Sequence, residues 1–289
     1  LIALAIAWWP AYFKQQWNTW VSLGSRLVFI VVVFFLKGIL FPSSPATSIY
    51  LSEEGRESVL DCYETLLSDW PENTSSRYIE TSYGKVHVLE CGPDSAPPLM
   101  MLHAASMGAH SWAENLEPLA DSFHIFAIDN IGEGNRSELK DAQVYPKSRK
   151  EIADLYASIA DSLNIASSPV FGASNGGFIA LNYACYYPER VESLALFGPM
   201  GLTQITNGSI FMLAVASLYP FQGIRDAVAD WALGTDPYCH EKYGEWFDRI
   251  MKNTIPSVFQ PVPVTSEEKQ NLTMPVLLFL GSMDRIVGD

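Results

Sequence analysis

Positive charge is scarce in this 289-residue chain. Lysine and arginine together number 18, against 32 aspartate and glutamate residues, and the formal net charge is −14. Proteins that bind nucleic acid neutralise its phosphates with clustered lysine and arginine, and no such cluster occurs here. The composition therefore argues against a nucleic-acid partner, while a hydrophobic content of 48% argues against general disorder.

Cysteine and histidine are also few. The four cysteines are widely separated and form no Cys-x-x-Cys pair, and the five histidines occur singly. No spacing typical of metal ligands is present, so we expect neither a bound metal nor a cofactor. Buried, unpaired cysteines are the simplest interpretation of Cys62, Cys91, Cys185 and Cys239.

Long apolar runs occur only at the start of the chain. Residues 1–13 and 27–41 are nearly all apolar, but the second run is interrupted by Lys37. A membrane span needs roughly 20 apolar residues, so this run suffices only if residues 20–23 enter the interface and Lys37 extends toward it. We predict that residues 1–41 form a membrane anchor or hairpin; a buried or amphipathic helix and an uncleaved signal segment are the alternatives.

If both runs span a membrane, Lys14 and Arg26 lie in the loop between them. Positive charges favour the cytoplasmic side, which would place the rest of the chain outside the cytoplasm. Residues 42–49 contain two prolines and several small polar residues, a composition typical of a linker. We therefore expect a membrane-anchored domain that begins near residue 50 and lies outside the cytoplasm.

From residue 50 to residue 200 predicted strands alternate with predicted helices. Such alternation indicates a mostly parallel sheet that is covered by helices on both faces. The pattern stops within residues 201–266, where helical spacing at 210–219, 228–233 and 243–251 predicts a helical cap, and it resumes in residues 267–289. We expect helices at 52–69, 111–119 and 152–163, a hairpin of 77–81 and 85–91, and strands at 98–102, 124–128, 169–171, 191–197 and 275–280.

One stretch of this pattern carries a chemical motif. The strand ending at Phe171 runs into Gly-x-Ser-x-Gly, formed by Gly172, Ser174 and Gly176, and a helical pattern follows at once. A nucleophile elbow needs this order of strand, sharp turn and helix, because the serine sits in a strained turn. The flanking glycines let strand and helix approach closely. A structural strand-to-helix turn with an uninvolved serine is the alternative.

Four motifs, in order along the chain, resemble the α/β-hydrolase superfamily. They are the loop from His103 with Trp112 after it, residues 128–137, the elbow at residues 172–176, and residues 281–287. From about Tyr50 onward the chain is similar to capped bacterial serine carboxylesterases of the naproxen-esterase type. The resemblance implies an α/β-hydrolase fold with a helical cap.

The resemblance also implies roles for individual residues. Ser174 corresponds to the nucleophile, Asp284 to the acid of the catalytic triad, and the backbone N–H groups of Asn175 and Ala105 to the oxyanion hole. Ala104 departs from the family pattern, in which glycine is usual. A left-handed backbone there would strain alanine, unless the loop follows another path.

Two further side chains have structural and catalytic interpretations. Asp129 follows a predicted strand and is a second candidate for the acid, although its position in the family is mostly structural, fixing the loop at 132–137. For His103 a structural role in holding its loop is preferred over a catalytic one. The chain order Ser, Asp, His requires a histidine after Asp284, and only residues 285–289 follow it. We therefore expect this sequence to be a fragment, catalytically impaired, whose triad histidine lies beyond Asp289.

The resemblance implies hydrolysis of carboxylic esters through an acyl-enzyme. The predicted cap is rich in aromatic side chains and poor in positive charge, which favours an apolar ester substrate over an anionic one, although packing between cap and core explains most of these side chains equally well. A lipase or a carbon–carbon bond hydrolase of the same fold is an alternative, and cofactor-free haloperoxidase activity is a minor one. A non-catalytic, membrane-attached binding protein is an alternative of another class.

Overall fold

The computed structural model describes residues 48–142, 144–203, 236–255 and 261–282, together with Gly223, Asp226, Ala229, Asp230, Leu233 and Gly234. The predicted membrane anchor at 1–41, part of the predicted cap and Asp284 lie outside these residues. No helix within the described ranges is long and apolar enough to cross a bilayer. The expectations of a membrane anchor and an extracytoplasmic position therefore remain predictions.

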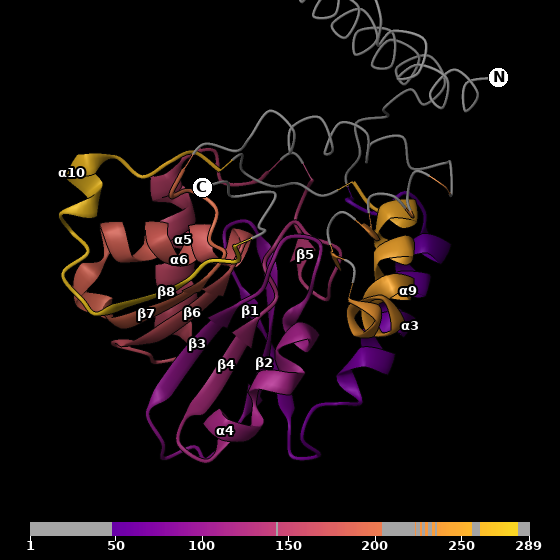
Figure 1. Cartoon of the computed structure of the whole chain (residues 1–289), viewed down its shortest axis with the longest axis horizontal. Coiled ribbons are helices and arrows are strands. Elements are labelled where there is room, and N and C mark those ends of the chain that lie inside the picture. Colours follow the sequence, from indigo (N-terminus) through magenta and orange to yellow (C-terminus); the bar gives the residue numbers. More distant parts are fainter. Residues whose placement is uncertain are drawn as a thin grey trace, which may run out of the picture. The chain divides into compact units, whose positions relative to one another are not determined.

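The centre of the domain is an eight-stranded sheet with the order β1-β2-β4-β3-β6-β7-β8, in which the short β5 pairs with β2 (Figure 1). The five strands from β4 to β8 in this order run parallel, and β1 and β2 form an antiparallel hairpin at one end. This arrangement confirms the predicted mostly parallel sheet and its hairpin. The strands are β1 Ser75–Glu80, β2 Gly84–Cys91, β3 Pro98–Leu102, β4 His124–Ile128, β5 Glu138–Leu139, β6 Ser168–Ala173, β7 Val191–Phe197 and β8 Val276–Phe279.

Helices cover both faces of the sheet (Figure 1). The helices α5 and α6 pack on one face, and the 3₁₀-helix η1 with α4 packs on the other. The helix α9, which belongs to the predicted cap, packs against α3. The helices are α3 Glu53–Leu67, η1 Ala109–Asn115, α4 Glu117–Ala120, α5 Arg149–Ser162, α6 Asn175–Tyr186, η2 Pro188–Arg190, α9 Pro237–Asn253 and α10 Ser266–Lys269.

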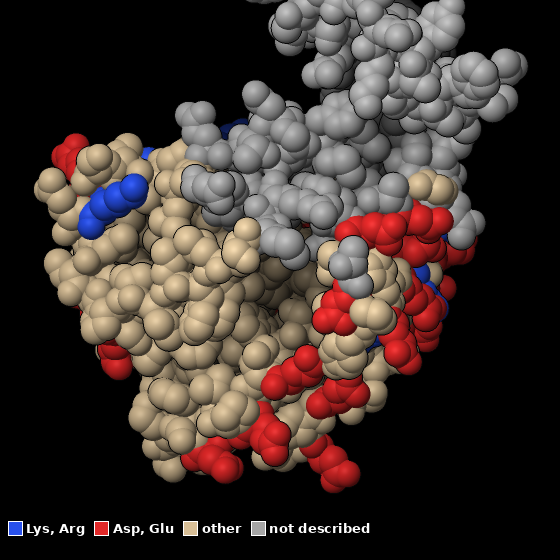
Figure 2. All heavy atoms as spheres, viewed as in Figure 1, with Lys and Arg blue, Asp and Glu red and all other residues tan. Residues whose placement is uncertain are grey.

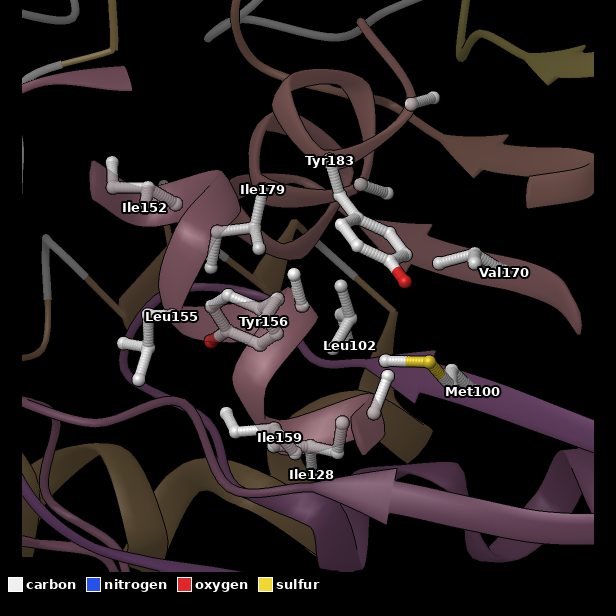
Figure 3. Packing of buried hydrophobic residues seen from close by; sticks show 14 of the residues in the cluster. Met100, Leu102, Ile128, Ile152, Leu155, Tyr156, Ile159, Val170, Ile179 and Tyr183 are labelled. Carbon is white, nitrogen blue, oxygen red and sulfur yellow. The ribbon is translucent and has the colours of Figure 1, made fainter. Parts of the chain in front are cut away.

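The two faces of the sheet divide the apolar core into two layers. Along β3, Met100 and Leu102 contribute to the layer under α5 and α6, whereas Leu99 and Met101 contribute to the layer under η1 and α4. Successive side chains of a strand point to opposite faces, so a strand that is covered on both sides must be apolar throughout. Figure 3 shows the first layer, where Tyr156 and Ile179 meet the side chains of β3 and β4.

Local sequence explains where the main helices begin. Ser52 caps α3 by accepting a hydrogen bond from the Gly55 N–H at 3.0 Å, and Ser148 caps α5 by accepting one from the Glu151 N–H at 3.2 Å. A serine in this position satisfies an amide that the helix leaves free. The predicted helices at 52–69 and 152–163 are confirmed with small changes of their bounds.

One predicted element was wrong in kind. Residues 111–119 form no single α-helix but a 3₁₀-helix, η1, followed by the four-residue α4. Pro118 lies in the first turn of α4 and has no backbone N–H to donate to the carbonyl group four residues earlier, so a continuous α-helix loses a hydrogen bond there. The helix that packs on this face is therefore broken near Leu116, although Trp112 and Leu116 still reach the core as predicted. The short elements β5 and α10 were not predicted.

At the end opposite the hairpin, β8 is exposed. Val276, Leu277, Leu278 and Phe279 are each 43–56% exposed, so side chains on both faces of this strand are in contact with solvent. The strand is held by its ladder with β7 and by stacking of Phe279 on Phe197, whose ring centroids are 4.8 Å apart.

Candidate active site

The elbow at residues 172–176 joins β6 to α6 at the carboxyl end of the sheet. Ser174 occupies this turn with φ 49° and ψ −110°, a backbone conformation that serine rarely adopts. The surrounding backbone fixes it: the Ser174 N–H donates to Phe197 O at 2.9 Å, and the Ser174 carbonyl accepts from Phe178 N–H at 3.1 Å and Met200 N–H at 3.0 Å. The strained turn that the motif predicted is therefore present, with Ser174 partly exposed.

Both glycines of the motif are required sterically. A Cβ on Gly172 would lie 2.6 Å from the carbonyl oxygen of Gly176, and a Cβ on Gly176 would lie 2.1 Å from the carbonyl oxygen of Leu102. Neither neighbour can move aside, because each is a backbone atom in a strand or a helix. Strand, turn and helix can approach this closely only without side chains at these two positions.

The loop at residues 103–107 follows β3 and lies beside the elbow; it is called the oxyanion loop below, after the role that the sequence predicts for it. The two are neighbours because β3 pairs with β6, with Leu102 opposite Gly172. The loop contains a turn that is closed by a hydrogen bond of 3.1 Å from Met107 N–H to Ala104 O. Ser106 has φ 61° in this turn, whereas Ala104 is not in the left-handed region.

This geometry shows whether alanine at position 104 is strained. The left-handed residue lies two positions later than the glycine of the family pattern would suggest, so alanine at 104 adopts an ordinary backbone and Ser106 carries the strain. The loop thus follows a different path from the one that a glycine at 104 would require.

The two proposed oxyanion donors have no acceptor within the described part of the chain. Asn175 is the first residue of α6, where a helix cannot supply a partner for the backbone N–H. No hydrogen bond from the Ala105 N–H to another described residue is present either, although the Ser106 N–H donates to Glu133 and the Ala104 carbonyl oxygen accepts from Met107. Ala105 and Ser174 are both partly exposed, whereas the Asn175 side chain is buried.

A carboxyl group that sequence reasoning did not single out connects the loop to the elbow. Glu133 is 1% exposed, and its Oε2 accepts from the Ser106 N–H at 2.5 Å while its Oε1 accepts from the Asn175 Nδ2 at 3.0 Å. Burial raises the pKa of Glu133 to about 8, although both hydrogen bonds act in the opposite direction. The neutral carboxyl group is therefore the main form at pH 7, and the ionised form prevails above about pH 8.

Trp246 of α9 holds the other side of the same turn. Its indole N–H donates to the Ser106 carbonyl oxygen at 2.8 Å, and the side chain is fully buried between Tyr63 and His110. From the sequence, Trp246 was either a lining of an apolar substrate pocket or packing between cap and core. The structure supports packing for this residue, and Phe247 packs beside it.

Asp129 lies at the centre of a separate network. It accepts from His87 Nδ1 at 2.8 Å, from the Tyr63 hydroxyl at 3.0 Å and from the Ala109 N–H at 2.7 Å. Burial opposes ionisation of this carboxyl, but the interactions with His87 and with the Ala109 N–H outweigh it, and the pKa of Asp129 is lowered. Because its carbonyl oxygen also accepts from the Ser137 hydroxyl, Asp129 fixes the loop that follows β4.

His103 holds the oxyanion loop, in agreement with the structural role preferred from the sequence. Its Nε2 accepts from the Asn130 N–H at 2.8 Å, and its Nδ1 lies 2.8 Å from the Ala104 carbonyl oxygen. The Asn130 N–H can only donate, so Nε2 is the acceptor and the ring proton resides on Nδ1. Burial lowers the pKa of His103 and keeps the ring neutral.

The other four histidines form their contacts away from the elbow. His87 pairs with Asp129, His124 lies 3.5 Å from Glu90, and the His240 Nε2 lies 2.6 Å from Gly234 O. His110 is buried against Trp246 and finds no hydrogen-bond partner among the described residues for either ring nitrogen, and burial lowers its pKa to about 3. No hydrogen bond between any of the five histidines and Ser174 occurs in the described ranges.

Fold and site together define the class of protein: a mostly parallel sheet with helices on both faces and a strained serine between β6 and α6 is the α/β-hydrolase fold. A family profile described as alpha/beta hydrolase fold matches residues 97–213.

The chain is similar to an uncharacterized carboxylesterase, nap, and to carboxylesterase YbfK, both from Bacillus subtilis. Each is 29% identical over 231 residues, which cover 78% and 76% of this chain and 75% of either relative. Among solved structures, naproxen esterase (carboxylesterase NP) from Bacillus subtilis superposes with a TM-score of 0.74 and 26% identity, covering 82% of this chain and 84% of that one. These matches confirm the resemblance to naproxen-esterase-type carboxylesterases that the sequence motifs indicated.

Proposed function

We propose that this chain is a serine hydrolase that cleaves carboxylic esters and that Ser174 is its nucleophile. The observation that carries the proposal is the strained backbone of Ser174, with φ 49°, beside two backbone N–H groups that have no acceptor in the described part of the chain. A protein keeps such strain where the geometry serves a function. The similarity to carboxylesterases supports the choice of esters.

In the proposed reaction the Ser174 Oγ attacks the carbonyl carbon of the ester, and the carbonyl oxygen becomes an oxyanion. The N–H groups of Ala105 and Asn175 donate to this oxyanion, which develops only as the transition state is reached. The oxyanion then collapses, the alcohol leaves with the proton that Ser174 gave up, and an acyl-enzyme remains. Water releases the carboxylic acid and restores the Ser174 hydroxyl.

The proton of Ser174 needs an acceptor, and Asp284 is the proposed acid that would orient one. Asp284 lies outside the described residues, so its assignment rests on the sequence motif alone. The contacts of the five histidines give each of them another environment, and the proposal assigns the proton acceptor to none of them.

Uncharged, apolar esters are the proposed substrates. The chain has a net charge of −14. Figure 2 shows acidic side chains gathered over the side formed by α3 and α9, where the exposed carboxylates include Glu53, Glu57, Asp61, Glu64 and Glu245. Such a surface repels anionic substrates and does not affect the approach of neutral ones.

A panel of p-nitrophenyl esters tests the proposal, with acyl chains of different length and one anionic ester of similar size. We expect release of nitrophenol by the full-length wild-type protein, slower release from the anionic ester, and a loss of activity to the background rate in Ser174→Ala. A carbon–carbon bond hydrolase would instead cleave a diketone substrate faster than any ester in the panel. Equal nitrophenol release by Ser174→Ala and the wild type would contradict the role of Ser174.

A further inference from the structure

Glu133 joins two chain segments whose relative position must be fixed for the proposed reaction. The oxyanion loop supplies Ala105, and the elbow supplies Asn175. The Glu133 carboxyl group accepts one hydrogen bond from each segment, from the Ser106 N–H at 2.5 Å and from the Asn175 side chain at 3.0 Å. The two donors are 27 and 42 residues away in sequence, so these bonds tie together parts of the chain that no local interaction connects.

The hydrogen bond to Ser106 acts on a strained peptide. Ser106 has φ 61°, and a left-handed serine is strained unless its surroundings hold it. Glu133 binds the N–H of Ser106, and Trp246 binds its carbonyl oxygen. The peptide plane on each side of Ser106 is thereby fixed. The Ala105 N–H lies in the preceding plane, whose Ala104 carbonyl oxygen accepts from the Met107 N–H at 3.1 Å in the same turn.

We propose that Glu133 is a positioning residue: its carboxyl group holds the oxyanion loop against the elbow, so that the N–H groups of Ala105 and Asn175 point toward one oxyanion. This inference rests on the proposed function of Ser174 and extends it. Glu133 contacts neither the serine hydroxyl nor the reacting carbonyl group and acts through Ser106 and the Asn175 side chain.

The surroundings of Glu133 determine when it carries charge. Besides its two donors, the ionisable groups that affect it are the buried Asp129 carboxylate and the Tyr156 hydroxyl, which donates to Asn130 Oδ1 at 2.8 Å. Burial, with a smaller contribution from the Asp129 charge, raises the pKa of Glu133 to about 8. The ionised form accepts both hydrogen bonds fully, whereas the neutral form must place its own proton on one of the two oxygens.

A fluorophosphonate inactivator, which phosphonylates an activated serine, measures the effect directly. At a pH above about 8 the ionised Glu133 accepts from both donors, whereas in Glu133→Gln one oxygen remains to accept and the new N–H group faces the other donor. We expect the maximal rate of inactivation to fall about tenfold or more, because a displaced donor stabilises the transition state poorly. The inhibitor concentration that gives half of this rate should change less than about twofold, since ground-state binding does not use the oxyanion donors.

Glu90→Gln is the matched control. Glu90 is also a buried glutamate, 4% exposed, but it pairs with Arg77 in the β1–β2 hairpin, away from the elbow. We expect Glu90→Gln to lower thermal stability while the folded protein is inactivated at the wild-type rate. A merely structural role of Glu133 would produce the same pattern as this control.

A second variant tests whether Glu133 acts through Asn175. Asn175→Ala removes the side chain that Glu133 binds and keeps the backbone N–H. We expect it to slow inactivation as well, and the double variant Glu133→Ala/Asn175→Ala to be little slower than Glu133→Ala, because Glu133→Ala already removes the contact that Asn175→Ala removes. Two effects that multiply would overturn the proposed coupling.

Failure of this inference differs from failure of the proposed function. If Ser174→Ala is not labelled and Glu133→Gln reacts at the wild-type rate, Glu133 has no positioning role and Ser174 remains the nucleophile. If Ser174→Ala is labelled as fast as the wild type, both proposals are wrong. If Ser174→Ala is not labelled, and Glu133→Gln reacts slowly while folded Glu90→Gln reacts at the wild-type rate, the proposed function and the positioning role of Glu133 are both supported.

Discussion

Two carboxyl groups in one short segment, Asp129 and Glu133, show how far burial and hydrogen bonding can separate residues of similar chemistry. Asp129 accepts three hydrogen bonds at 3.0 Å or less, two of them from side chains, and its pKa is lowered. Glu133 accepts two hydrogen bonds, and burial raises its pKa to about 8. The number and strength of donors decide whether a buried carboxyl group ionises.

The raised pKa of Glu133 predicts a specific dependence of stability on pH. An unfolded glutamate has the ordinary value of 4.5, so between pH 4.5 and about 8 the folded protein retains a proton that the unfolded chain releases. The free energy of unfolding should therefore fall as pH rises through this window, by on the order of a few kcal/mol in total. Urea denaturation of wild type and Glu133→Gln at intervals from pH 5 to 9 measures it. Parallel curves for the two proteins would contradict the raised pKa.

At the scale of elements, the strand–elbow–helix unit is set by sterics. A Cβ at position 176 would lie 2.1 Å from the Leu102 carbonyl oxygen. The start of α6 can therefore approach the end of β3 this closely only if residue 176 is glycine. This contact places the oxyanion loop, which begins after Leu102, next to Ser174. A Gly-x-Ser-x-Gly sequence therefore specifies a packing distance as well as a turn.

Gly176→Ala should destabilise the protein by about 3 kcal/mol, because the new methyl group overlaps backbone atoms that cannot move apart without shifting a strand. Gly244→Ala provides the control. Gly244 lies inside α9, where an added methyl group would meet no neighbouring atom within 4 Å, and alanine should gain up to about 1 kcal/mol from its better helix propensity. Chemical denaturation of both variants measures these changes. A neutral Gly176→Ala would show that the elbow is not as closely packed as the structure has it.

Elements also show what the sequence alone could predict. The apolar runs of β3, β4 and β7 and the helical spacing of α5 were recognisable because each pattern is local. The break between η1 and α4 was missed, although Pro118 was a visible signal for it. The contacts of Glu133 and Trp246 could not be found in this way. Their partners are 27 and 140 residues distant, and nothing local distinguishes them from an exposed glutamate or a core tryptophan.

At the scale of the whole molecule, the sheet brings distant motifs to one edge. The oxyanion loop follows β3, the segment with Asp129 and Glu133 follows β4, and Ser174 follows β6, and these three strands are neighbours in the sheet. Ligands of parallel α/β sheets bind at the carboxyl ends of the strands, so the order of the strands assembles the site. The sequence indicated the motifs and their order, while the contacts among them required the fold.

The most direct test of the account is to locate the phosphonyl group after the protein reacts with a fluorophosphonate. Trypsin cleaves after Lys150 and Arg190, and residues 151–189 contain no lysine or arginine, so one peptide carries the elbow. Fragmentation of this peptide in a mass spectrometer distinguishes Ser174 from its other serines. The account predicts a single phosphonyl group on Ser174 and an unmodified peptide in Ser174→Ala. Modification of another residue at the same rate in both proteins would contradict it.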